Sequence, residues 1–362
     1  MANDDFHNPT RCLKGRGAVS NLAGRFVDAV STRESDGWED QLEPVTTIAT
    51  VAIEEKARSI ITRNNSPDLP FSQSINAYRG CEHGCIYCYA RPAHAYVDLS
   101  PGLDFETRLF FKPNAAELLE QALRKPGYRC SPIALGTNTD PYQPLEKHKR
   151  ITREILETLQ HFQHPVTIVT KSQLILRDLP LLAEMAQDGL AHVGISVTTL
   201  DNDLKRKLEP RTAGPGARLR TIEALSDAGI PTAVMAAPMI PALNDCELEA
   251  ILSRSREAGA IHAAYILLRL PFEVAPLFRQ WLAEHYPERA EHVMSIVQQS
   301  RGGRDYQSSF GERQRGNGVF AQLLQQRFRV HCRKLGLNQN KLKLDCDRFT
   351  PPPQSGDQQS LF

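Results

Sequence analysis

The sequence has no apolar run that approaches the roughly 20 residues needed for a membrane-spanning helix. The N-terminal stretch Met1–Asp5 is polar and acidic, whereas a secretory signal begins with a basic segment and continues with an apolar one. Cysteine is sparse, with eight residues in a chain of 362. Because disulfides form in oxidising compartments, this cysteine usage without a signal is typical of a reducing cytosol. We therefore expect a cytoplasmic protein that does not bind a membrane.

The chain as a whole also lacks a large net charge, since 43 Lys and Arg residues oppose 42 Asp and Glu residues. The balance is uneven, however. Between Arg301 and Thr350, eleven basic residues oppose four acidic ones, an excess of seven positive charges. Such asymmetry is typical of a nucleic-acid-binding face, and equally of an ordinary solvated basic surface.

Three of the cysteines stand close together in the stretch 79–91. Cys85 follows Cys81 by four positions and Cys88 follows Cys85 by three, and Gly80 and Gly84 lie where a tight loop must turn. Thiolates are strong ligands for soft metals and for iron–sulfur clusters. Three ligands are one short of closing a cubane cluster, so one iron stays open to a small molecule. An open coordination position is typical of a reactive site.

Two other interpretations of the cysteines stay open. A structural zinc site needs a fourth ligand, which His83 or His94 can supply. Cys332 and Cys346 can belong to a second metal site. The remaining cysteines are scattered and are interpreted as ordinary thiols: Cys12, Cys130 and Cys246.

The C-x-x-x-C-x-aromatic-C spacing resembles the cluster loop of the radical S-adenosylmethionine (SAM) enzymes. Tyr87 and Tyr89 around Cys88 narrow the resemblance to the branch that contains spore photoproduct lyase. The stretches 74–85 and 136–144 resemble an uncharacterised bacterial subgroup of that branch. The likeness runs from about Gly15 to the C-terminus.

The resemblance implies a [4Fe–4S] cluster on Cys81, Cys85 and Cys88, with SAM bound to the open iron. It implies reductive cleavage of SAM to a 5′-deoxyadenosyl radical, and hence a reducing partner of flavodoxin or ferredoxin type. The basic C-terminal region indicates a nucleic-acid face, and the clamp-like tail described below favours DNA as the substrate. RNA, a peptide or a metabolite are alternatives, as is a non-catalytic, metal-containing nucleic-acid-binding protein.

Hydrophobic patterning predicts an α/β fold from residue 72 onward. Strands are predicted at 73–78, 132–135, 165–169, 192–197, 231–237 and 262–268, with helices between them. Alternating strands and helices predict a parallel sheet. Together with the family resemblance, the parallel sheet predicts a partial (β/α)6 barrel of radical SAM type with N- and C-terminal extensions. The expected segments are 1–70 (N-terminal extension), 71–300 (core), 301–349 (basic extension) and 350–362 (flexible tail).

Polar motifs follow the predicted strands where parallel barrels place their sites. By resemblance, the loop after the second strand contacts the SAM amino group, Lys171 the carboxylate, Ser196 the ribose and Tyr87 the adenine. The loop consists of Gly136, Thr137, Asn138, Thr139 and Asp140. The alternatives are an ordinary turn, a solvated lysine and a core aromatic residue.

Other polar residues near the predicted strand ends bind substrate or form salt bridges: Glu146, Glu209, Arg211 and Arg269. Arg91 and His94 follow the cluster loop and are expected to support it. Spore photoproduct lyase carries a hydrogen-donating cysteine where this sequence has Thr137. Since no cysteine lies between Gly136 and Tyr142, we do not expect the same photoproduct chemistry, and no residue is assigned as the substrate-radical partner.

The tail ends in two large apolar residues behind a stretch rich in Pro, Gly, Ser and Gln. Gln358–Phe362 resembles the pentapeptide with which bacterial repair and replication proteins bind the DNA sliding clamp, and it departs from that pattern at Gln359. Leu361 and Phe362 would fill an apolar pocket. A tail that folds back on the core is the alternative.

Overall fold

The computed structural model describes residues 13–27, 48–341 and 343–353. Its main sheet has seven strands in the order β10-β9-β8-β7-β6-β3-β2. The strands are β2 (Ile61–Arg63), β3 (Gln73–Ile75), β6 (Ile133–Leu135), β7 (Val166–Thr170), β8 (Ala191–Ser196), β9 (Thr232–Met239) and β10 (His262–Leu267). The pairs from β3 to β10 are parallel, and β2 joins β3 antiparallel. The predicted α/β fold with six parallel strands is therefore confirmed.

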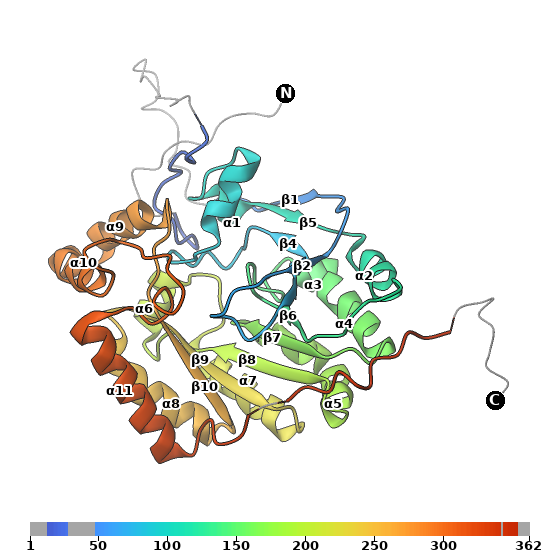
Figure 1. Ribbon diagram of the computed structural model, residues 1–362. Coiled ribbons are helices and arrows are strands. Elements are labelled where there is room, and N and C mark those ends of the chain that lie inside the picture. Colours follow the sequence, from blue (N-terminus) through green and yellow to red (C-terminus); the bar gives the residue numbers. More distant parts are fainter. Residues whose placement is uncertain (1–12, 28–47, 342, 354–362) are drawn as a thin grey trace.

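Helices pack along the sheet because each presents an apolar stripe to it. On α4 (Ile151–His161), the buried residues Ile151, Ile155 and Leu159 recur every four positions. Contacts join α5 to β8, α7 to β8 and β9, α8 to β9 and α11 to β10 (Figure 1). The other helix bounds are α1 (Asp104–Thr107), α2 (Ala115–Leu123), α3 (Glu146–Lys149), α5 (Leu179–Gln187), α6 (Asn202–Leu208), α7 (Pro215–Asp227), α8 (Leu248–Glu257), α9 (Val274–His285), α10 (Ala290–Gln299) and α11 (Gly318–Leu335). None of the helices in the described ranges has the length and apolar character to cross a bilayer.

The strand predicted at 73–78 is wrong in one respect, because the chain leaves the main sheet after Ile75. Tyr78–Arg79 forms β4 of a second sheet, with β5 (Arg108–Phe111) and β1 (Val51–Glu54) in the order β1-β5-β4. The break falls where β6, the parallel partner of β3, also ends, since Ile75 pairs with Leu135. Beyond this pair, Asn76 Oδ1 accepts hydrogen bonds from the backbone of Asn138 and from the Thr137 hydroxyl. The break directs the cysteine loop that follows β4.

The boundaries proposed between core and extensions remain predictions. The C-terminal segment contacts the sheet edge, since the Asn338 side chain pairs with both backbone groups of Ala263 at the start of β10. The residues 350–353 are described, whereas the Gln358–Phe362 motif lies outside the described residues.

Candidate active site

The cysteine loop follows β4 and is held at several backbone points. Cys81 N donates to Phe105 O at 2.9 Å, and Cys88 N donates to Cys85 O at 3.2 Å. Cys81 and Cys85 are buried and Cys88 is partly buried. Burial raises the pKa of the Cys81 thiol well above its usual range, and Asp140, Cys85 and Cys88 raise it further. The three thiols are thus close enough to repel one another when ionised.

Such a set of thiols fits an iron–sulfur cluster better than a single ion. Among the described residues, no three His, Cys, Asp or Glu side chains are arranged to hold one metal ion. A [4Fe–4S] cluster allows its thiolate ligands to lie farther apart than a single ion does, because each thiolate binds a different iron. Of the fourth ligands considered for zinc, His83 Nδ1 lies 3.3 Å from Asp140 Oδ2. His94 Nε2 lies 2.9 Å from Arg108 O, and the buried His94 Nδ1 has no hydrogen-bond partner among the described residues.

A buried ion pair braces the cysteine loop from behind. Arg91 and Glu106 are both fully buried, and Arg91 Nη2 donates to Glu106 Oε1 at 2.5 Å. Arg91 Nε also donates to Cys85 O at 2.9 Å. The Glu106 carboxylate accepts from the backbone N–H groups of Gly17 and Ala18 at 2.9 and 2.8 Å. One carboxylate therefore joins the N-terminal segment to the loop.

The Gly136–Asp140 loop leaves β6 at a position that requires glycine. Gly136 has φ +86°, and a Cβ there would lie 2.0 Å from Val169 O. Asp140 accepts from Thr170 Oγ1 at 2.6 Å and from Lys171 N at 2.8 Å. Burial tends to raise the pKa of Asp140, but His83 and these hydrogen bonds outweigh it and lower the pKa to about 2. Asp140 thus ties the loop to β7 and to the cysteine loop.

Tyr89 connects the cysteine loop to the same β6 loop. Its hydroxyl donates to Thr137 O, and the Arg269 guanidinium lies 4.4 Å from its ring centroid. Thr139 Oγ1 donates to Tyr78 O at 3.2 Å. The loop after β6, the cysteine loop and the segment after β10 therefore meet at one place.

Glu209 is the centre of a buried polar network under the cysteine loop. It is fully buried and accepts from the Tyr87 hydroxyl, from Thr198 Oγ1 at 2.7 Å and from Arg218. Burial tends to raise its pKa, but the charges of Arg218 and Lys171 outweigh this and lower the pKa to about 2. Tyr87 is therefore oriented by an ionised carboxylate.

Lys171 follows β7 and faces this network. Its Nζ lies 5.8 Å from the Tyr87 ring centroid. Burial disfavours the charged ammonium, but the neighbouring Cys85 and Glu209 outweigh this effect and raise its pKa. A fixed positive charge therefore stands beside the thiols, where it can bind a carboxylate.

Ser196 ends β8 and is buried. Its carbonyl oxygen accepts from Arg218 Nη1 at 2.9 Å, which ties Ser196 to the Glu209 network. All eight residues predicted to bind SAM thus lie on strand ends or loops linked by these contacts.

Residues 75–254 match the family model of the radical SAM superfamily. This part of the chain is a radical SAM domain. An uncharacterized protein of Mycobacterium tuberculosis is 42% identical over 226 residues, covering 62% of this chain and 66% of that protein, just under two thirds of its length. An uncharacterized protein of Methanocaldococcus jannaschii is 27% identical, covering 67% of this chain and 86% of that protein.

Solved structures show the same fold. Spore photoproduct lyase complexed with dinucleoside spore photoproduct has a TM-score of 0.57 at 13% identity, covering 79% of this chain and 80% of that one. A variant of that lyase with bound AdoMet and the dinucleoside has a TM-score of 0.56. The radical SAM-type fold predicted from the resemblance is confirmed, and the fold of spore photoproduct lyase is similar to it. The cofactors of the superfamily are a [4Fe–4S] cluster and SAM, as the resemblance implied.

Several supporting residues of this radical SAM chain were not found from sequence. Glu106 carried no signal, because its partners Arg91 and Gly17 are 15 and 89 residues away. Glu209 stood in a noted motif, but nothing local showed that it is buried. Glu146 is also structural: it accepts from Tyr78 and from Arg177 Nη2 at 2.7 Å.

The second metal site considered at Cys332 and Cys346 remains a prediction. Cys332 is buried among the apolar core residues.

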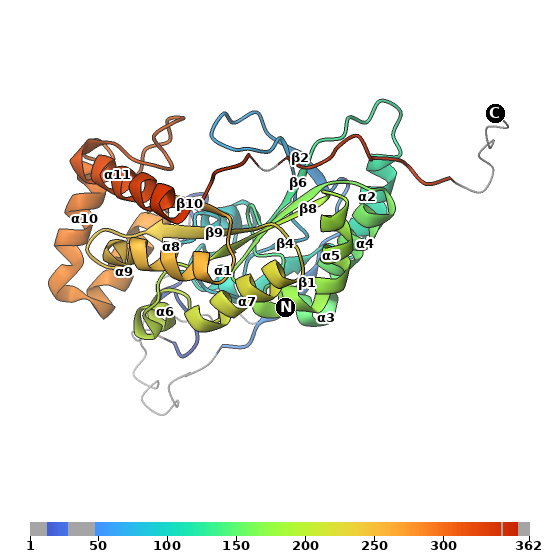
Figure 2. The same cartoon turned by 90° about the horizontal axis from the view of Figure 1, so that it is seen from below.

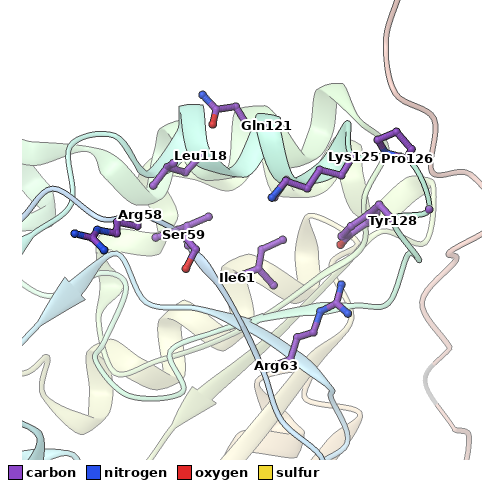
Figure 3. A pocket seen from close by; sticks show the side chains of 12 residues that line it. Arg58, Ser59, Ile61, Arg63, Leu118, Gln121, Lys125, Pro126 and Tyr128 are labelled. Atoms are coloured by element: carbon purple, nitrogen blue, oxygen red, sulfur yellow. The ribbon is translucent and has the colours of Figure 1, made fainter.

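A hollow of about 330 Å³ lies between β2 and α2, and Arg58, Arg63, Lys125 and Tyr128 are among the residues that line it (Figure 3). No residue of the cysteine loop or of the strand ends described above lines it, so it is separate from the candidate site.

Proposed function

We propose that this protein is a radical SAM enzyme of the cytosol that holds a [4Fe–4S] cluster on Cys81, Cys85 and Cys88. The observation that carries the proposal is the three neighbouring thiols on a braced loop beside the Lys171 ammonium. Held on these three thiolates and reduced, the cluster would supply the electron for reductive cleavage of SAM. The protein's part is to hold SAM in one orientation, with Lys171 on its carboxylate and the Gly136–Asp140 loop on its amino group.

In this proposal Tyr87 lies against the adenine and Ser196 against the ribose. The network around Glu209 supports both positions, because it fixes the Tyr87 hydroxyl and the Ser196 carbonyl. Asp140 acts by holding the loop, since its oxygens already accept from Thr170 and Lys171.

Replacing Lys171 by alanine is expected to weaken SAM binding by ~1–3 kcal/mol, because a charge-assisted hydrogen bond is lost. Isothermal titration of the anaerobic holoprotein with SAM measures this. Lys147→Ala, an exposed lysine on α3, is the matched control and should bind normally. Unchanged affinity in both Lys171→Ala and the Thr137→Ala/Asn138→Ala variant would argue against this pocket.

We propose DNA as the substrate, with a reaction other than the photoproduct lyase reaction because Thr137 stands where that enzyme has a cysteine. Support comes from the solved complexes of spore photoproduct lyase and from the basic C-terminal extension.

Anaerobic reconstitution of the protein should give about four irons per chain and SAM cleavage on reduction. Bound zinc without SAM cleavage would defeat the enzymatic proposal. Label exchanged from deuterated 5′-deoxyadenosine into DNA, rather than into RNA, peptides or metabolites, identifies the substrate.

Two partners belong to the proposal: a flavodoxin- or ferredoxin-type reductant, and the bacterial sliding clamp. The full-length protein should bind a purified clamp at micromolar concentration through Gln358–Phe362, with Leu361 and Phe362 as apolar anchors. A version that ends at Asp357 should not bind, as surface plasmon resonance would show. Equal binding by both versions, or binding by neither, removes the clamp from the proposal.

A further inference from the structure

The basic C-terminal extension is only partly available to a partner. Arg301 is fully buried and donates to the carbonyls of Leu267 and Leu268. Three further arginines form ion pairs, namely Arg313 with Asp68, Arg327 with Glu249, and Arg348 with Asp188. These four residues stabilise the fold, so any binding face must be sought among the remaining basic residues.

Helix α11 carries the densest set of those residues. Its 18 residues, GVFAQLLQQRFRVHCRKL, include no acidic side chain. Exposed polar residues recur at spacings of four, three and four, which places them on one face of a helix. They are Gln322, Gln326, Arg329 and Arg333.

An exposed apolar stripe runs beside this polar stripe. Val319, Leu323 and Val330 are 84%, 52% and 56% exposed, whereas Leu324 and Cys332 on the opposite side are buried. Leu323 and Val330 also border a hollow of about 320 Å³ with Gln326. Apolar side chains exposed on a folded helix mark a contact surface.

Helix α11 lies on the outside of the molecule, and its N-terminal end lies toward the candidate active site. In Figures 1 and 2 it lies outside α8 and β10, both of which it contacts. Gln314, just before the helix, accepts a hydrogen bond from Leu267 N at the carboxyl end of β10, and Asn338, just after it, pairs with Ala263 at the beginning of β10. Helix α11 therefore runs antiparallel to β10, with its N-terminus toward the strand ends that carry the site.

We propose that the Gln322–Arg333 face of α11 docks duplex DNA and leads it to the active site. The inference rests on the proposed function and names its docking surface. Glutamine and arginine are the side chains that pair bidentately with adenine and guanine, and small apolar groups contact the thymine methyl. The 18 residues of the helix span about 27 Å, or about eight base pairs.

Helix geometry favours DNA over RNA. The major groove of B-form DNA admits an α-helix, whereas the narrow major groove of an RNA duplex does not. Arg329 and Arg333 lie on the half of α11 farther from the site, so they would hold the flanking duplex, and Val319 and Gln322 would lie nearest the reacting nucleotide.

The test is fluorescence anisotropy of the anaerobic holoenzyme with a labelled 20-base-pair DNA duplex at several salt concentrations. Arg329→Ala/Arg333→Ala should weaken binding about tenfold or more and reduce the slope of log K against log salt by about two. The charge-matched control Lys147→Ala/Arg220→Ala removes two exposed cations from α3 and α7 and should bind like wild type. An RNA duplex of the same sequence should bind at least about tenfold more weakly than DNA.

Equal DNA binding by wild type and Arg329→Ala/Arg333→Ala would overturn the docking surface alone. So would an equal loss in the Lys147/Arg220 control, or equal affinity for the RNA duplex. A wild-type enzyme that cleaves SAM but binds no DNA duplex would overturn the DNA substrate of the proposed function as well.

Discussion

Replacing Cys81, Cys85 and Cys88 together by alanine is expected to abolish the visible absorption of the anaerobically reconstituted protein. The three thiols are the proposed ligands, and a cluster without thiolate ligands is not retained. Iron content and reductive formation of 5′-deoxyadenosine should fall to background. Absorption spectroscopy, iron analysis and chromatography of the reaction products measure the three effects.

Cys246→Ala is the matched control for the triple variant, because Cys246 is an exposed thiol outside the cysteine loop. It should retain the cluster and its absorption. A triple variant that still carries a full complement of iron would show that other residues hold the cluster.

Changing Glu106 to glutamine is expected to lower the free energy of unfolding by about 3–5 kcal/mol, since it leaves the Arg91 guanidinium buried without its counter-charge. Arg91 and Glu106 are both fully buried. The change should also loosen the cysteine loop, because Arg91 donates to the carbonyls of Cys85 and Gly84. Urea unfolding followed by circular dichroism measures the loss.

The matched control is Asp203→Asn, which breaks the exposed pair of Asp203 and Arg206. It should change the free energy of unfolding by no more than about 1 kcal/mol, because solvent screens exposed ion pairs. A Glu106→Gln protein as stable as wild type would mean that the pair does not brace the loop.

Local patterns explain how much of the fold was predictable. The run of β-branched residues Val166–Thr170 predicted β7 within one residue, because β-branched side chains favour strands. The spacing of Cys81, Cys85 and Cys88 indicated the cluster loop, since ligands on one tight turn are necessarily near one another. Where a strand ended early, as at Ile75, the reason lay far along the chain: its partner strand β6 ends at Leu135, which no local pattern around Ile75 contains.

By itself, the sequence determined the strand–helix order, the cysteine loop and the loops that follow the strands, because these depend on neighbours along the chain. Only the tertiary structure decided which charged residues are buried. Glu106 and Glu209 are ordinary acidic residues in sequence, and they become buried, ion-paired braces because Arg91 and Arg218 are brought to them as the chain folds. The tertiary structure also decided which basic residues are buried: Arg301 is buried and supports the sheet edge, whereas Arg329 and Arg333 remain exposed. Burial is a property of the packed chain, and a buried charge persists only where packing also supplies its partner.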